Sequence, residues 1–235
     1  ISLGTSIMET DMPQMTKYEP GTFCWAELAT TDTEAAKKFY TQVMGWSVED
    51  QPMPDDLGTY TMLKKDGKQV CALYSQSADE RKMGIPAHWA RYVAVASVDA
   101  IATKVSALGG KVIAEPFDVM DAGRMAVAAD PTGAMIHFWE AKKHIGAELI
   151  GETGAMVWNE VLTTNIDVAA SFYRDLFGWN IKVTDAGGIK YVQLMLGDKM
   201  VAGMMPNDKM GARFARPTWV TYFAVPDCEK AVETA

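Results

Sequence analysis

The chain repeats itself, and this constrains its fold more than any other feature of the sequence. The segment WAELATTD at 25–32 returns as WNEVLTTN at 158–165, an offset of 133 residues (25 to 158). Phe-Tyr and Gly-Trp pairs follow at the same offset, and Tyr60 matches Tyr191 at a slightly shorter one. A third pair, 89–95 and 219–225, is also similar. The sequence therefore predicts a tandem duplication with a unit of roughly 130 residues.

Each unit itself consists of two similar blocks that alternate one strand, one helix and three short strands. The first helix is expected to begin at a capping box formed by Thr31 and Glu34, to pack through Ala36, Phe39 and Val43, and to end at Gly45. The segments expected to be strands are 23–29, 46–49, 59–64, 69–74, 89–95, 111–114, 124–129 and 134–140, with a second helix at 99–108. The building block is βαβββ.

The pattern predicts an α+β fold of tandem paired βαβββ modules whose fourth module is incomplete. We expect a leader at 1–20, a first unit at 21–141, a linker at 142–154 and a second unit at 155–235. The fourth block begins at Trp219, and the sequence stops at Ala235 within its helix. Two full units call for about 270 residues, so we expect the given sequence to be truncated before the last three strands.

Charge and cysteine content narrow the classes of function. The chain has 22 basic and 30 acidic residues and a formal net charge of −8, which argues against nucleic acid as a partner. No apolar run is long enough to span a membrane, and the first 20 residues do not resemble a signal peptide. Cys24, Cys71 and Cys228 form no CxxC motif, which favours reduced thiols in the cytoplasm.

Several motifs resemble one known superfamily. They are WAEL at 25–28, DAGR at 121–124, DPTGA at 130–134 and HIGA at 144–147. With the paired βαβββ blocks they are similar to the vicinal oxygen chelate superfamily, which includes glyoxalase I, bleomycin-resistance proteins, fosfomycin-resistance enzymes and extradiol dioxygenases. More narrowly, the chain resembles bacterial tandem glyoxalase-like proteins over about 20–235.

The resemblance implies a divalent metal between two blocks, held by His and Glu from the first strands and the final strand. Those positions fall on Trp25, Ala90 and His137 in the first unit, and on Trp158 and Val220 in the second. Of these residues only His137 can ligate a metal. We therefore predict no cofactor, while a divalent metal held by a different ligand set stays open.

Glu27 and His137 are the candidate catalytic residues. Strand alternation places Glu27 on the face of Trp25, and His137 on the face of Trp139. Glu27 and His137 could form a two-ligand site or an acid–base pair, with Glu27 as the base. The alternative is that Glu27 is a structural carboxylate and His137 a satisfied strand histidine. We expect His88 to lie at the surface and His144 in a solvated linker.

Aromatic residues on the same faces are the candidate ligand-binding residues. Those with the expected parity are Trp25, Tyr92 and Trp139 in the first unit, and Trp158 and Tyr222, together with Glu160, in the second. They could wall a small-molecule site or fill a core. Arg124 could bind an anionic group in that site or pair with Asp121.

These features favour a protein that binds a small organic molecule in an aromatic-lined cleft. Whether it is an enzyme stays open. Glu27 and His137 could support a lyase or isomerase that abstracts a proton beside a carbonyl. The alternative is a non-catalytic protein that sequesters a drug or metabolite, as bleomycin-resistance proteins do. A third hypothesis is a metal-dependent glyoxalase or dioxygenase with non-standard ligands. A homodimer is compatible with the module pattern.

Overall fold

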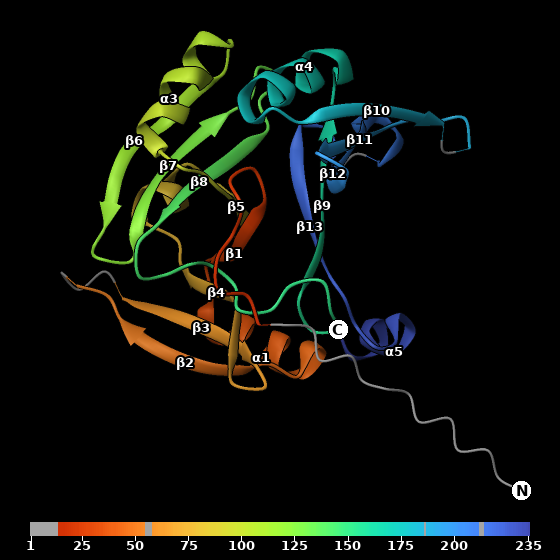
Figure 1. Cartoon of the computed structure of the whole chain (residues 1–235). Helices are drawn as coiled ribbons and strands as arrows, with labels where there is room; N and C mark the ends of the chain where they lie inside the picture. The colour runs from red at the N-terminus through yellow and green to blue at the C-terminus, as the bar shows by residue number, and fades with distance from the viewer. Residues whose placement is uncertain (1–13, 55–57, 186, 212–213) are drawn as a thin grey trace, which may run out of the picture.

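A computed structural model describes residues 14–54, 58–185, 187–211 and 214–235. In this part of the chain 13 strands form two sheets, with helices packed against them (Figure 1). The α+β fold built from βαβββ modules is therefore confirmed, whereas the residue boundaries of the two units stay predictions. None of the described helices is long and apolar enough to cross a membrane.

Four modules follow one another along the chain. The first comprises β1 (Phe23–Thr30), α1 (Thr33–Met44), β2 (Ser47–Pro52), β3 (Thr59–Lys65) and β4 (Lys68–Ser75). A short helix, α2 (Ala78–Lys82), leads to β5 (His88–Ala94), α3 (Val98–Ala107), β6 (Lys111–Val119), β7 (Gly123–Ala129) and β8 (Met135–Ala141). The third comprises β9 (Met156–Thr163), α4 (Ile166–Phe177), β10 (Asn180–Asp185), β11 (Lys190–Leu196) and β12 (Lys199–Pro206), followed by a 3-10 turn, η1 (Asn207–Lys209). The fourth contributes β13 (Thr218–Phe223) and α5 (Cys228–Thr234).

The two sheets share one topology. The first has the order β2-β3-β4-β1-β5-β8-β7-β6, and the second has the order β10-β11-β12-β9-β13. In each, the module's first strand pairs in parallel with its last and antiparallel with the first strand of the next module. The first sheet curls so that β2 and β6, its edge strands, lie on opposite sides of the central strands (Figure 1).

The start of α1 differs from the prediction in one residue. Asp32, and not Thr31, is the cap, because its carboxylate accepts a hydrogen bond from the Ala35 N–H at 2.9 Å. The helix ends at Gly45 in the left-handed conformation, as predicted. It packs through Ala36, Tyr40 and Met44, whereas Phe39 is 38% exposed. The expected apolar face was therefore wrong at Phe39.

Strand β6 runs five residues further than predicted, to Val119. The sequence contains Pro116 there, which argues against a central strand because proline has no N–H to donate. β6 is an edge strand of the first sheet, so its outer side needs no hydrogen bonds and the proline is tolerated.

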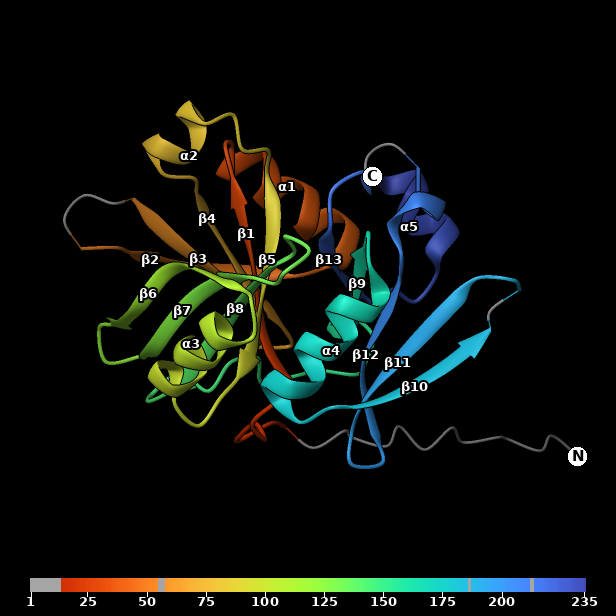
Figure 2. The same ribbon diagram turned by 90° about the horizontal axis from the view of Figure 1, so that it is seen from above.

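One continuous core joins the two sheets through the faces that α1, α3 and α4 cover. Figure 2 shows α3 and α4 side by side between the sheets. Two equivalent tryptophans cross this junction. The Trp46 indole donates to the carbonyl of Gly154 at 2.7 Å, just before β9, and the Trp179 indole donates to the carbonyl of Gly21 at 3.0 Å, just before β1.

The segment after β8, residues 142–149, crosses the opposite, concave face of the first sheet, and we call it the strap. Three of its backbone N–H groups donate to carbonyl groups of the first sheet and its loops. His144 donates to Ala122 at 3.0 Å, Ala147 to Cys24 at 2.8 Å, and Glu148 to Gln69 at 2.7 Å. Gly146 has φ +113°, and a Cβ there would lie 2.3 Å from the Cys24 carbonyl oxygen. Only glycine combines that backbone conformation with this close approach.

Candidate functional site

Glu27 lies in the middle of the concave face of the first sheet, held by two tyrosines. Its side chain is 9% exposed. The Tyr60 hydroxyl from β3 donates to one carboxylate oxygen at 2.8 Å, and the Tyr92 hydroxyl from β5 donates to the other. The Trp25 indole in turn donates to the Tyr60 hydroxyl at 3.0 Å. We call Trp25, Glu27, Tyr60 and Tyr92 the Glu27 cluster.

Burial controls the charge of this cluster. It raises the pKa of the Glu27 carboxyl above its ordinary value, although hydrogen bonds from Tyr92 and Tyr60 act in the opposite direction. Burial also raises the pKa of both tyrosines, and the nearby Glu27 carboxylate adds to that shift. The tyrosines therefore remain hydroxyl donors, and Glu27 is a carboxyl group that takes up a proton more readily than usual.

His137 lies beside the cluster but not against Glu27. β8 pairs with β5 so that His137 is opposite Tyr92, and their rings are 4.9 Å apart. Its Nδ1 has no hydrogen-bond partner among the described residues. Burial lowers the pKa of His137 to about 3, with contributions from Arg91 and His88. His137 is therefore a neutral imidazole, and Tyr92 separates it from the carboxylate with which we predicted it to pair.

The aromatic residues predicted for the first unit share this face. Trp25, Tyr92 and Trp139 are all buried there, because the strap and Tyr18 cover the part of the face that these three residues occupy. Trp139 also lines a cavity of about 340 Å³ with Tyr18 and Ile145. Tyr60 and His137 are only half-buried, so the accessible part of the face is the part next to these two residues.

His144 was wrongly predicted to be solvated. Its ring lies edge-on to Trp25 at 4.6 Å and 5.9 Å from Trp139, and its carbonyl accepts the Trp139 indole N–H at 2.8 Å. Burial lowers the pKa of His144 to about 4. The strap therefore packs as part of the fold, which its linker-like composition did not indicate.

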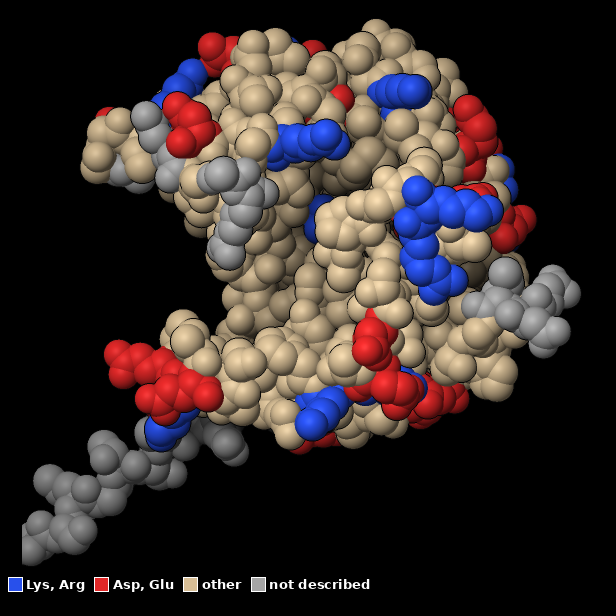
Figure 3. Space-filling model, turned by 180° about the vertical axis from the view of Figure 1, so that it is seen from behind, with Lys and Arg blue, Asp and Glu red and all other residues tan. Residues whose placement is uncertain are grey.

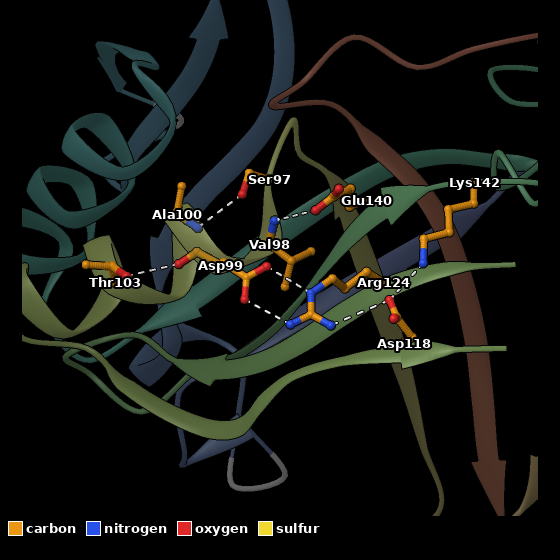
Figure 4. A network of polar contacts seen from close by, with 9 residues as sticks. All are labelled: Ser97, Val98, Asp99, Ala100, Thr103, Asp118, Arg124, Glu140 and Lys142. Carbon is orange, nitrogen blue, oxygen red and sulfur yellow. Dashed lines mark hydrogen bonds and ion pairs between the residues drawn. The ribbon is translucent and has the colours of Figure 1, made fainter. Parts of the chain in front are cut away.

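The structure does not place Arg124 in the predicted aromatic site, because its side chain lies on the other face of the sheet. On β7 it alternates with Met125, which is opposite Trp139 on the concave face. Its guanidinium binds both carboxylate oxygens of Asp99 on α3 at 2.9 Å and lies 3.5 Å from Asp118 (Figure 4). Arg124 thus fastens α3 to the sheet and cannot anchor an anion beside Glu27. Asp121, its predicted alternative partner, pairs with Lys143.

Tyr60 is the functional candidate that the sequence-based prediction omitted. The signal was present, because Tyr60 has a counterpart in Tyr191 in the internal repeat and shares one face of β3 with Met62. Its contact with Glu27 depends on how β3, β4 and β1 align, which is a register between distant segments. Local patterning does not determine that register.

The second sheet carries the remaining predicted residues together. Glu160 is buried on β9, and the Tyr222 hydroxyl from β13 donates to it at 3.1 Å. Trp158 precedes it by two residues and is half-buried. These residues repeat the positions of Glu27, Tyr92 and Trp25.

The donor set of the first sheet does not fit a divalent metal. The described part of the chain contains no group of three or more His, Cys, Asp or Glu side chains that could hold one. Both oxygens of Glu27 already accept tyrosine hydroxyls, and His137 lies across Tyr92 from them. We derive no chemical step through a metal from these residues.

A curled sheet of paired βαβββ modules with a polar cluster on its concave face defines a glyoxalase-like protein. The family model described as Glyoxalase/Bleomycin resistance protein/Dioxygenase superfamily matches residues 22–138. "Putative glyoxylase CFP32" from Mycobacterium bovis is 41% identical over 226 residues, covering 95% of this chain and 85% of that protein. The chain therefore belongs to the glyoxalase/bleomycin resistance protein/dioxygenase superfamily.

Other relatives carry different names. "Anthracycline biosynthesis protein DnrV" from Streptomyces peucetius is 36% identical over 231 residues, covering 94% of this chain and 83% of that protein. Among solved structures, the Mn(II)-bound glyoxalase from Novosphingobium aromaticivorans has a TM-score of 0.56 at 20% identity. The match covers 80% of this chain but only 62% of that glyoxalase. An extradiol ring-cleaving dioxygenase from B. fuscum has a TM-score of 0.55 at 17% identity. These two structures share the fold.

Proposed function

We propose that the chain binds a small planar aromatic molecule on the concave face of the first sheet, next to Tyr60 and His137. The observation that carries this proposal is the buried Glu27 carboxyl, held by two tyrosine hydroxyls in an otherwise apolar, aromatic face. Apolar walls with a few fixed polar groups are typical of small-molecule sites. The relatives named for anthracycline biosynthesis support an aromatic ligand bearing several oxygens.

Binding can be tested with 1,8-dihydroxyanthraquinone, a planar probe that carries both phenol and carbonyl oxygens. Titration calorimetry should detect binding to the wild-type chain. In Tyr60→Phe the affinity should fall roughly 3- to 10-fold, the equivalent of one hydrogen bond. Tyr40→Phe is the matched control, because Tyr40 accepts the Trp89 indole N–H among the core residues and does not touch the concave face. Equal losses in both variants would contradict the proposed site.

Proton abstraction beside a carbonyl is a second proposal, and the raised pKa of Glu27 favours it. A carboxylate with a raised pKa is a stronger base than an ordinary one. Tyr60 and Tyr92 would orient it. The lowered pKa of His137 disfavours the imidazolium that would act as a general acid, but the neutral ring keeps one N–H that could donate a hydrogen bond to the carbonyl oxygen. Glu27 is therefore the proposed base, and His137 is assigned to ligand contact.

Deuterium exchange separates the enzyme from the pure binding protein. Proton NMR in D₂O would follow exchange at the carbon beside the carbonyl of 1-tetralone, with and without the chain. Acceleration by the wild type and by Tyr40→Phe, and its loss in Glu27→Gln, would support the base assignment. Exchange that survives in Glu27→Gln refutes that assignment. No acceleration by the wild type refutes the catalytic proposal and favours sequestration of the ligand without turnover.

We also propose that the protein works in the cytoplasm. Its three cysteines are free thiols, and Cys24 and Cys71 are buried in the apolar interior, as is usual where disulfides do not form. A homodimer stays a prediction, and sedimentation velocity of the purified chain would test it.

A further inference from the structure

The second sheet repeats the frame of the Glu27 cluster. On β1 and β5, Trp25 is opposite Tyr92, and Glu27 follows two residues after Trp25. On β9 and β13, Trp158 is opposite Tyr222, and Glu160 follows two residues after Trp158. Equal registers in two sheets place the same three side-chain types in the same relative positions.

The hydrogen bonds are repeated as well. The Tyr222 hydroxyl donates to Glu160 at 3.1 Å, as the Tyr92 hydroxyl does to Glu27. Tyr191 on β11 is hydrogen-bonded to both Glu160 and Trp158, as Tyr60 is to Glu27 and Trp25. We call Trp158, Glu160, Tyr191 and Tyr222 the Glu160 cluster. Burial, with the nearby Glu160 carboxylate, raises the pKa of Tyr222 to about 12, so it stays a hydroxyl donor.

The two clusters differ in access. Tyr222 is 38% exposed, whereas Tyr92 is 4% exposed. The strap covers the first cluster from one side. The second cluster lies on the face of its sheet that α4 leaves uncovered. When the molecule is seen from behind, it is deeply hollowed between the β10–β11 hairpin and α5 (Figure 3). Among the described residues, the ring of Tyr222 is therefore more accessible than that of Tyr92.

Gly203 on β12 makes room for this cluster. It is opposite Glu160, in the position that Ala72 holds opposite Glu27. A Cβ at Gly203 would lie 2.0 Å from the Tyr191 hydroxyl oxygen and 2.9 Å from a Glu160 carboxylate oxygen. The missing side chain lets Tyr191 approach Glu160, so Gly203→Ala should displace the tyrosine while leaving every polar group in the chain.

We propose that the Glu160 cluster is a second binding site, for a planar aromatic molecule that carries a hydroxyl group. Trp158, Tyr191 and Tyr222 offer ring faces for stacking. Glu160, which is 6% exposed, offers a fixed acceptor for the ligand hydroxyl. The aromatic ligand class rests on the function proposed above.

Fluorine NMR of the chain labelled with 5-fluorotryptophan can observe both sites in one sample. The chain has seven tryptophans, and the signals of Trp25 and Trp158 can be assigned by replacing each with Phe. On titration with 1,8-dihydroxyanthraquinone, the Trp158 signal should shift in the wild type and saturate. In Gly203→Ala that shift should be lost or need at least about tenfold more probe, while the Trp25 response is retained.

Gly197→Ala in the β11–β12 turn is the control, because a Cβ there meets nothing within 4 Å, and its φ of +58° confines the strain of alanine to the turn. A Trp158 signal that stays still while the Trp25 signal shifts refutes the second site and leaves the proposed function intact. A Trp158 shift alone supports the second site and contradicts the first. If neither signal moves, both proposals fail. Should Gly203→Ala not fold, Tyr222→Phe removes one Glu160 hydrogen bond and should weaken only the Trp158 response.

Discussion

At the scale of single residues, Glu27 links stability to pH. The pKa of a glutamate in an unfolded chain is about 4.3, and burial raises it in the folded protein. Between the two values the folded chain holds a proton that the unfolded chain has lost, so the free energy of unfolding falls as pH rises. Glu27→Gln lacks this dependence. Urea unfolding of both proteins should show the wild type losing stability relative to the variant above a pH of about 4.3; a constant difference would contradict the raised pKa.

His144 should act in the opposite direction and over a different pH range. Its pKa is lowered to about 4, whereas an unfolded histidine has a pKa of about 6.5. As pH falls through this range the unfolded chain takes up a proton that the folded chain refuses, so stability decreases. His144→Gln removes that loss, of the order of 3 kcal/mol. Unfolding at several pH values should show a smaller acid-induced decrease in the variant, while the decrease caused by His137 remains.

At the scale of elements, the strap depends on Gly146. An alanine there would meet the Cys24 carbonyl and adopt a strained φ, so Gly146→Ala should cost about 2–4 kcal/mol. Gly133→Ala is the control, because Gly133 has a similar φ of +103° but nothing within 4 Å of its Cβ position. The Gly146 variant alone should expose Trp25 and Trp139, which a red shift of tryptophan fluorescence would report. Equal behaviour of both variants would mean that the close contact is unimportant.

Elements built from local signals were predictable from the sequence, and contacts between distant segments were not. The repeat and the strand alternation indicated the module order, the faces of Trp25 and Glu27, and the end of α1 at Gly45. Arg124 was considered for anion binding because of its motif, whereas its alternation with Met125 places it on the opposite face of the sheet. His144 was missed because a polar segment can be fixed by backbone hydrogen bonds, which side-chain composition does not reveal.

At the scale of the whole molecule, the shared core predicts one cooperative unfolding transition. Phe23 on β1 packs against Trp179, just before β10, and Trp219 on β13, with ring centroids 6.2 and 5.2 Å away. Phe23→Ala should therefore lower the stability of both sheets together by about 3–5 kcal/mol. Phe39→Ala, at an exposed position, should change stability by less than about 1 kcal/mol. Far-ultraviolet circular dichroism and tryptophan fluorescence should give coincident denaturation curves; two separated transitions would contradict a common core.

The paired tryptophan contacts carry a consequence for how such a chain can arise. Trp46 binds the carbonyl of Gly154, and Trp179 binds the carbonyl of Gly21. The two tryptophans are 133 residues apart (46 to 179), and so are the two glycines (21 to 154). Each half therefore donates to the other the same hydrogen bond that it accepts from it. Reciprocal contacts of this kind define an isologous interface, the type that two identical subunits form about a twofold axis. The junction between the sheets thus has, within one polypeptide, the reciprocal contacts that are typical of a twofold interface between identical subunits.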